Sequence, residues 1–103
     1  MEKQIIQIEQ FFQFLEDEYS YELYYKSPPS TKICKSINYY KDYRTIEIQL
    51  HKNLTYFYLN VITEKDESFT ITSFNNKMIF CDELTNENLQ KSKLKLLDFL
   101  TSK

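Results

Sequence analysis

The 103 residues contain no glycine. Glycine reaches positive φ without strain and lets a backbone come close to a ligand. Its absence excludes Walker-type phosphate loops, dinucleotide-binding fingerprints and the strand-turn-helix nucleophile elbow, because each of these motifs needs glycine at set positions. Turns must instead be built from Asn, Asp and Pro. Candidate turns lie at residues 27–30, 41–43, 51–53, 64–67 and 75–76.

Helical patterns open and close the chain. Over residues 2–18, apolar residues recur at steps of three and four, which predicts an amphipathic helix. A second helix is predicted from about residue 86, with Thr85 or Asp82 as its N-cap and with lysines toward its C-terminal half, where cations favour the helix dipole. The inward-facing stripes are Ile5, Ile6, Ile8, Phe11, Phe12, Phe14, Leu15 and Tyr19 in the first helix, and Leu89, Lys93, Leu96, Leu97 and Leu100 in the second.

Between the helical patterns, the period of the apolar residues falls to two, which is typical of strands with one buried face. In one run, Phe57 and Leu59 alternate with Tyr56 and Tyr58. Short turns separate consecutive runs, which favours antiparallel pairing between neighbours along the chain. Strands are predicted at residues 20–26, 33–41, 45–50, 54–62 and 68–74.

The order of these elements predicts an α+β fold, with an N-terminal helix, an antiparallel sheet of four or five strands in a meander, and a C-terminal helix. Both helices are expected on one face of the sheet, over Phe57, Leu59 and Val61, which leaves Tyr56 and Tyr58 on the other face. The length and the 42% content of hydrophobic residues suffice for one core, so residues 1–103 are expected to form a single domain.

The sequence favours a cytoplasmic protein. It has no window of 18 apolar residues, and its N-terminal segment carries Glu2 and Glu9 where a signal peptide has an uninterrupted apolar run. Cys34 and Cys81 are far apart in the chain, with no second cysteine near either. Neither a disulfide framework nor a thiolate metal motif is therefore indicated, and both thiols are expected to be reduced and largely buried.

Catalytic motifs are absent from the sequence. His51 is the only histidine, it lies in a predicted turn, and no Ser or Cys stands at a recognisable spacing from it. A cysteine nucleophile and a histidine base must be close in the folded protein but not in the sequence. The pairing of Cys34 or Cys81 with His51 therefore stays open. The acidic clusters lack the spacing and the glycine of a calcium loop. We therefore expect a protein that is not an enzyme and that has no cofactor or metal.

Charge is uneven along a chain whose net charge is −2. Residues 1–25 hold six acids against one lysine, whereas residues 26–52 hold six bases against two acids. The basic stretch also carries tyrosines, and together these can bind nucleic acid through phosphate contacts and base stacking. The negative net charge and the single arginine, Arg44, argue against that function. Weak nucleic-acid binding is accordingly the third hypothesis.

Tyrosine is concentrated at residues 19–25 and 39–43. These rings suit a half-exposed sheet face, where cross-strand aromatic pairs contribute about 0.2–1 kcal/mol each, and they are also enriched in protein interfaces. The sequence leaves both explanations open, because some rings can stabilise the sheet while others contact a partner. Beside the first run, the carboxylates at residues 16–18 lie at the predicted end of a helix, where anions oppose the dipole. This unfavourable placement favours a basic partner.

The segment FFQFLEDEYSYEL at the end of the first helix is followed by INYYKDYRTIEIQL, a tyrosine-bearing hairpin, and then by further strands and a final helix. This arrangement resembles small bacterial α+β proteins found among the immunity proteins of polymorphic toxins. The resemblance spans most of the chain, contains no signature motif, and departs from many such sequences in lacking glycine near the first strand. It implies a cytoplasmic inhibitor that neutralises a toxin by covering its active site or an adjacent surface.

Two hypotheses therefore lead. The first is a non-catalytic, immunity-type inhibitor that binds a toxin or effector, with a basic toxin domain as its expected partner. The second is a self-associating structural or assembly module, a homodimer that uses the sheet edge or the tyrosines. No membrane partner is expected. The residues expected to contact the partner are Glu16, Asp17, Glu18, Tyr21, Glu22, Tyr24, Tyr40 and Tyr43, with the four tyrosines exposed.

Overall fold

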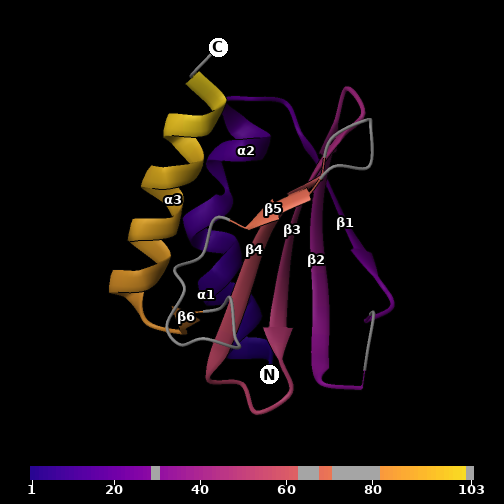
Figure 1. Cartoon of the computed structure of the whole chain (residues 1–103), viewed down its shortest axis with the longest axis vertical. Coiled ribbons are helices and arrows are strands. Elements are labelled where there is room, and N and C mark those ends of the chain that lie inside the picture. Colours follow the sequence, from indigo (N-terminus) through magenta and orange to yellow (C-terminus); the bar gives the residue numbers. More distant parts are fainter. Residues whose placement is uncertain (29–30, 63–67, 71–81, 102–103) are drawn as a thin grey trace.

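The computed structural model describes residues 1–28, 31–62, 68–70 and 82–101. Helices lie on one side of an antiparallel sheet (Figure 1). The predicted α+β class is thereby confirmed. The elements in chain order are α1 (Glu2–Phe12), α2 (Phe14–Asp17), β1 (Glu22–Lys26), β2 (Ile33–Lys41), β3 (Arg44–His51), β4 (Tyr56–Ile62), β5 (Ser68–Thr70), β6 (Asp82–Glu83) and α3 (Asn86–Thr101).

Strands β1 to β5 form the predicted meander, in which each strand pairs antiparallel with the next. The short β6, which the sequence pattern did not indicate, pairs with β4. Strand β2 has the predicted bounds, and β1, β3 and β4 differ from their predictions by one or two residues. Strand β5 covers the start of the predicted strand at 68–74, and the rest of that prediction lies outside the described residues.

The predicted first helix is divided in two at Gln13, which nevertheless keeps helical backbone angles of φ −57° and ψ −30°. The amides of Glu16 and Asp17 both donate to the Gln13 carbonyl, at 3.0 and 3.1 Å, so a 3₁₀-type hydrogen bond accompanies the α-helical one at the start of α2. Phe12 and Leu15 are buried as the spacing predicts, but Ile6 is exposed. The buried face of the helix is therefore narrower on the side of Ile6 than the sequence suggested.

The turns adopt conformations that glycine usually supplies. Asp42 and Tyr43 connect β2 to β3 with φ of 49° and 64°, as in a two-residue type I′ hairpin turn. Ser20 and Leu54 also have positive φ, of 60° and 65°. The predicted turns at 41–43 and 51–53 are confirmed, whereas those at 64–67 and 75–76 lie outside the described residues.

The core lies between the helices and the inner face of the sheet. Helix α3 begins as predicted at residue 86, where Thr85 Oγ1 accepts a hydrogen bond from the amide of Asn88 at 3.1 Å. Lys93 interrupts the apolar stripe of α3, but its Nζ lies 5.2 Å from the centre of the Phe14 ring. No described helix is long and apolar enough to cross a membrane. Fully buried core residues include Ile8, Phe12, Leu15, Ile37, Tyr39, Ile46, Ile48, Leu50, Phe57, Leu59, Val61, Leu89 and Leu96.

Candidate functional site

Four tyrosines share the face of the sheet that points away from the helices. Residues paired across an antiparallel ladder lie on the same face, and successive residues alternate between faces. The pairs Tyr24↔Asn38 and Gln49↔Tyr58 therefore share the outer face, whereas Tyr39↔Ile46 lies on the core face. We call the outer surface formed by Tyr24, Tyr40, Tyr56 and Tyr58 the tyrosine face. Among the described residues, no helix covers it (Figure 1).

The rings of the tyrosine face are partly accessible. Tyr40 and Tyr56 are 39% and 37% exposed, and Tyr24 and Tyr58 are half-buried. The predicted exclusion of Tyr56 and Tyr58 from the core is thus confirmed. Beside Tyr56, the His51 ring makes an edge contact at 6.3 Å between centroids. The exposed parts of these rings are therefore available for contact with another molecule.

The centre of the tyrosine face is a polar network. Glu47 accepts hydrogen bonds from Ser36 Oγ at 3.0 Å and from Gln49 Nε2 at 2.9 Å. Asn38 Nδ2 donates to Ser36 Oγ at 3.0 Å. Ser36 and Asn38 are fully buried although they lie on the outer face, because β2 is flanked by the longer side chains of its neighbouring strands. The network was not predicted, because short polar residues in a strand do not indicate burial.

One acceptor in this network has no hydrogen-bond donor, and one carboxylate has no cation beside it. Asn38 Oδ1 is buried and accepts no hydrogen bond. Glu47, which pairs with Asn38 across the ladder, has no cation within 4.0 Å in the described part of the chain. Buried acceptors are nearly always satisfied in folded proteins, so an unmatched one requires an explanation. The centre of the face therefore presents the half-buried negative charge of Glu47, with the unsatisfied acceptor of Asn38 enclosed beneath it.

Tyr43 projects from the turn between β2 and β3. It is 70% exposed, and its backbone is in the left-handed region. A non-glycine residue in that region costs roughly 1–2 kcal/mol. Burial of the ring does not offset this cost.

The eight predicted contact residues are divided between different parts of the structure. Glu22 and Tyr40 are paired across β1 and β2, and Tyr24 lies two positions further along β1, so these three share the tyrosine face. Glu16 and Asp17 belong to α2 and Glu18 caps it, so these acids lie on the helix layer. The predicted residues therefore do not form one continuous patch.

Tyr21 corrects the prediction that all four tyrosines are exposed. Its side chain is only 6% exposed. Tyr21 lies just before β1, two residues before Leu23 and four before Tyr25. Alternate residues of a strand share a face, so Tyr21 lies with these two residues on the core face. The period of two in the sequence contained this signal, because Tyr21 and Tyr24 cannot occupy the same face of one strand.

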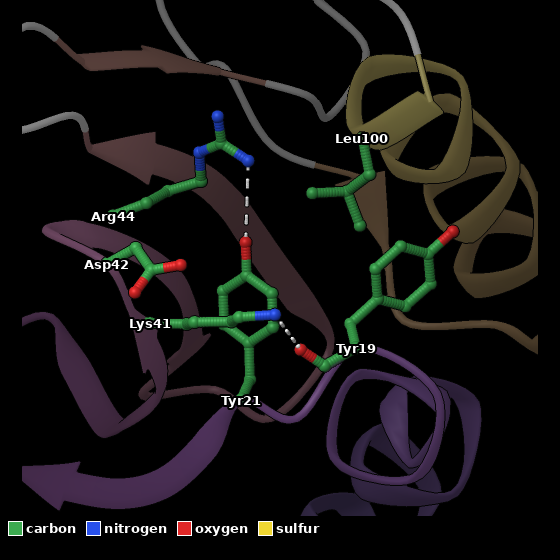
Figure 2. A pocket seen from close by; sticks show the side chains of 6 residues that line it. All are labelled: Tyr19, Tyr21, Lys41, Asp42, Arg44 and Leu100. Carbon is green, nitrogen blue, oxygen red and sulfur yellow. Dashed lines mark hydrogen bonds between the residues drawn. The ribbon is translucent and has the colours of Figure 1, made fainter.

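Tyr21 forms the floor of a cavity of about 190 Å³ at the end of the β2–β3 hairpin (Figure 2). Arg44 Nη1 donates to its hydroxyl at 3.5 Å, and Lys41 Nζ donates to the Tyr19 carbonyl at 2.7 Å. Lys41 Nζ also lies 6.0 Å from the centre of the Tyr21 ring. We call this cavity the hairpin-end pocket, and its lining residues are Tyr19, Tyr21, Lys41, Asp42, Arg44 and Leu100.

Two further tyrosines lie on the helix side of the sheet. The Tyr25 hydroxyl donates a short hydrogen bond to the Glu9 carboxylate of α1. This bond, together with partial burial, raises the pKa of Tyr25 to about 12. Burial in the core, followed by the negative charge of Glu9, also raises the pKa of Tyr39. Both phenols are therefore held in their protonated form at neutral pH.

The basic stretch of the sequence is dispersed in the structure. Lys41 and Arg44 face the helix layer at the hairpin-end pocket, whereas Lys35 Nζ lies 4.4 Å from the centre of the Tyr25 ring. Tyr39, expected beside these cations as a stacking ring, is fully buried. The cations and rings are therefore not combined in one stacking surface.

Of the residues weighed for catalysis, Cys34 and His51 lie in the described part of the chain. Cys34 is a free, half-buried thiol, and Cys81 lies outside the described residues. His51 Nδ1 accepts a hydrogen bond from the amide of Asn53 at 3.4 Å. Within the described part of the chain, no three His, Cys, Asp or Glu residues are grouped to hold a metal ion.

No protein-family model, no curated protein and no solved structure matches this chain.

Proposed function

We propose that this protein is a non-catalytic module that binds another protein through its tyrosine face, and that the partner inserts a Lys or Arg side chain at the centre of this face. The observation that carries the proposal is Asn38 Oδ1, a buried acceptor without a donor beside the half-buried Glu47 carboxylate. An unsatisfied buried polar group costs about 1–3 kcal/mol. A cationic donor would neutralise Glu47, and a shift of the side chains that enclose Asn38 would let the same donor satisfy its Oδ1 atom.

The surrounding rings suit such a contact. Tyr24 flanks Asn38 on β1, and Tyr58 flanks Gln49 on β4. Tyrosine rings attract cations through their π faces, and they supply large contact areas at a low cost in side-chain entropy. Rings around a central polar contact also exclude water, which strengthens the contact.

Tyr43 supports the same proposal from the backbone. Leu54 also has positive φ, but its side chain packs against the core, and this burial offsets the strain. Tyr43 combines an unfavourable backbone conformation with a side chain that is not buried, since the residue is 70% exposed. The two-residue turn requires positive φ at this position, but it does not require a tyrosine there, and strained residues cluster at functional sites. In this proposal, the Tyr43 ring contacts the partner beside the tyrosine face.

The more specific form of the proposal is an immunity-type inhibitor that acts in the cytoplasm and covers the active site, or an adjacent surface, of a toxin or effector. Glu22 adds negative charge to the tyrosine face beside the central Glu47, whereas the acids of α2 lie on the helix layer and add to the negative charge of the molecule as a whole. Complementary charge accelerates association and makes the association rate sensitive to salt. A basic enzyme domain, such as one that acts on nucleic acid, has the matching charge.

The test begins with capture of binding proteins from the native cytoplasm, and continues with the association kinetics of the purified partner. Glu47→Gln keeps the shape of the side chain and removes its charge. It should weaken binding by about tenfold or more, because a hydrogen bond to a charged group contributes about 1.5–3 kcal/mol. Tyr40→Ala should also weaken binding. Tyr43→Gly should weaken binding while it raises the free energy of unfolding relative to Tyr43→Ala, because glycine relieves the strain.

Glu87→Gln is the matched control, since it removes an exposed carboxylate from α3 on the helix layer. It should leave binding unchanged. A partner that binds the Glu47→Gln and Tyr40→Ala variants as tightly as the wild type would rule out the tyrosine face. Co-expression then tests the specific form: a captured protein that arrests growth alone, but not together with this chain, is a neutralised toxin.

Self-association is the second candidate, because among the described strands β1 lies at one end of the sheet with no strand paired to its outer edge. This edge is only five residues long and carries Glu22 and Lys26, features that oppose pairing with a second edge. Sedimentation equilibrium distinguishes the two candidates. A stable dimer that the Tyr40→Ala substitution dissociates would favour self-association through the same face.

A further inference from the structure

Lys41 and Arg44 are held opposite one another by the hairpin itself. They are the last paired residues of β2 and β3, and only Asp42 and Tyr43 separate them. Both alternate onto the core face, where their side chains enter the hairpin-end pocket. Like charges directly opposite each other on a sheet are destabilising. The fold therefore brings two cations together at an energetic cost.

In the described part of the chain, no carboxylate lies within 4.0 Å of the Lys41 or Arg44 nitrogen atoms. Lys41 Nζ bonds a neutral carbonyl, that of Tyr19, and Arg44 Nη1 bonds a neutral hydroxyl, that of Tyr21. The Arg44 guanidinium also lies 5.0 Å from the centre of the Phe99 ring of α3. Asp42 lines the pocket, but its carboxylate lies farther than 4.0 Å from the nitrogen atoms of both cations. Within the described residues, the half-buried charges of Lys41 and Arg44 therefore have no ion-pair partner.

Several donors remain available in the pocket. A lysine has three N–H donors and an arginine has five, so the two hydrogen bonds leave most of them unused. The Tyr21 hydroxyl accepts from Arg44 and keeps its own proton for donation. Figure 2 shows that Lys41 and Arg44 converge on the ring and hydroxyl of Tyr21, with Tyr19 and Leu100 on the facing side. The volume of about 190 Å³ admits a group of several heavy atoms.

We propose that the hairpin-end pocket is a binding site for an oxyanion, a carboxylate or a phosphate group, held by Lys41, Arg44 and the Tyr21 hydroxyl. The planar guanidinium of arginine matches both kinds of group through paired N–H donors. Two positive charges exclude a cationic ligand. The anion belongs either to a free small molecule or to an acidic side chain of a protein, and the site does not depend on the tyrosine face.

The experiment is a titration followed by two-dimensional ¹H–¹⁵N NMR at constant ionic strength. One series uses inorganic phosphate and the other uses N-acetyl-aspartate methylamide, which presents one side-chain carboxylate. The amide signals of Tyr21, Lys41 and Arg44 and the Nε–H signal of Arg44 should shift and saturate. Arg44→Gln should weaken the binding by about tenfold or more, because charge-assisted bonds to the guanidinium are lost.

Lys3→Gln is the matched control, because it removes one positive charge from the exposed start of α1. It should leave both titrations unchanged. Arg44→Lys keeps the charge and loses the planar donors, so its affinity should be intermediate. If Arg44→Gln does not fold, the affinity of Arg44→Lys tests the role of the guanidinium group instead.

The two series identify the source of the anion. Tighter binding of phosphate indicates a free phosphate-bearing ligand, whereas equal or tighter binding of the aspartate derivative indicates an acidic side chain of a protein. Shifts that do not saturate, or that are the same in the wild type and Arg44→Gln, would overturn the proposal. Neither result bears on the binding of a partner by the tyrosine face, which Glu47→Gln tests separately.

Discussion

At the scale of single residues, the absence of glycine has a measurable consequence. Four residues with a Cβ atom adopt positive φ, which glycine would adopt without strain. Asp42 suits its place, since Asp and Asn tolerate this region better than most residues. Leu54 gains from contact with the core, but Tyr43 has no such gain. The two-residue turn requires the backbone conformation of Tyr43, but burial of the ring does not offset the cost of a tyrosine there.

The Tyr25 hydroxyl makes stability depend on pH in the alkaline range. Its pKa is about 12 in the folded protein and 10.0 for the unperturbed group, so the unfolded chain loses this proton first as pH rises. The contribution is fully present below pH 10 and is lost between pH 10 and about 12. It is smaller than the shift alone implies, because Tyr25 is 49% exposed and solvent screens the interaction.

We therefore expect Tyr25→Phe to have a free energy of unfolding that falls less steeply with pH over this window than that of the wild type. Urea denaturation at a series of pH values measures the difference. Glu9→Gln should flatten the profile in the same way, since the hydrogen bond to Glu9 is the largest cause of the raised pKa. Parallel profiles for the wild type and both variants would show that this hydrogen bond does not contribute.

At the scale of elements, β2 differs from the other strands because the middle of both its faces is buried. Ile37 and Tyr39 contact the core, whereas Ser36 and Asn38 lie beneath the tyrosine face. Its outer-face neighbours are Tyr24 and Glu47, which flank Asn38 from β1 and β3. A central strand with polar residues on its second face positions acceptors rigidly, and this is the property that a binding site requires.

Helix α3 depends on a single side-chain cap. Thr85 Oγ1 accepts from the amide of Asn88, and the Thr85 carbonyl accepts from the amide of Leu89 at 2.9 Å. Thr85→Ala removes the first bond and keeps the second, so it should lower the free energy of unfolding by about 1 kcal/mol. Thr85→Ser keeps the hydroxyl and should retain most of the stability. Denaturation by urea compares the three proteins, and equal losses in both variants would contradict the capping role.

At the scale of the whole molecule, one core joins the three helices to the sheet. Leu96 is fully buried, whereas Leu94 on the same helix is 55% exposed. Leu96→Ala should lower the free energy of unfolding by about 2–5 kcal/mol through lost burial and an added cavity, whereas Leu94→Ala should change it by about 0.5 kcal/mol or less. Thermal or urea unfolding measures both changes. Similar losses at the two positions would show that α3 does not pack as described.

The sequence by itself determined the elements and their order. Helices and strands follow from periods that involve only neighbouring residues, and for this reason strand 33–41 and the start of α3 were predicted with the right bounds. The short turns also indicated the antiparallel meander. The placement of Tyr56 and Tyr58 away from the core followed from the same alternation.

Tertiary structure decided which side chains are brought together. The alternation does not specify which face the helices cover, nor which short residues are enclosed by longer neighbours, and both decide the burial of Tyr21 and Asn38. The pairing of Lys41 with Arg44, and the cavity that they share with α3, depend on a register and on a contact between the two ends of the chain. Local periods carry no information about such distant contacts, so the two candidate sites became visible only in the folded protein.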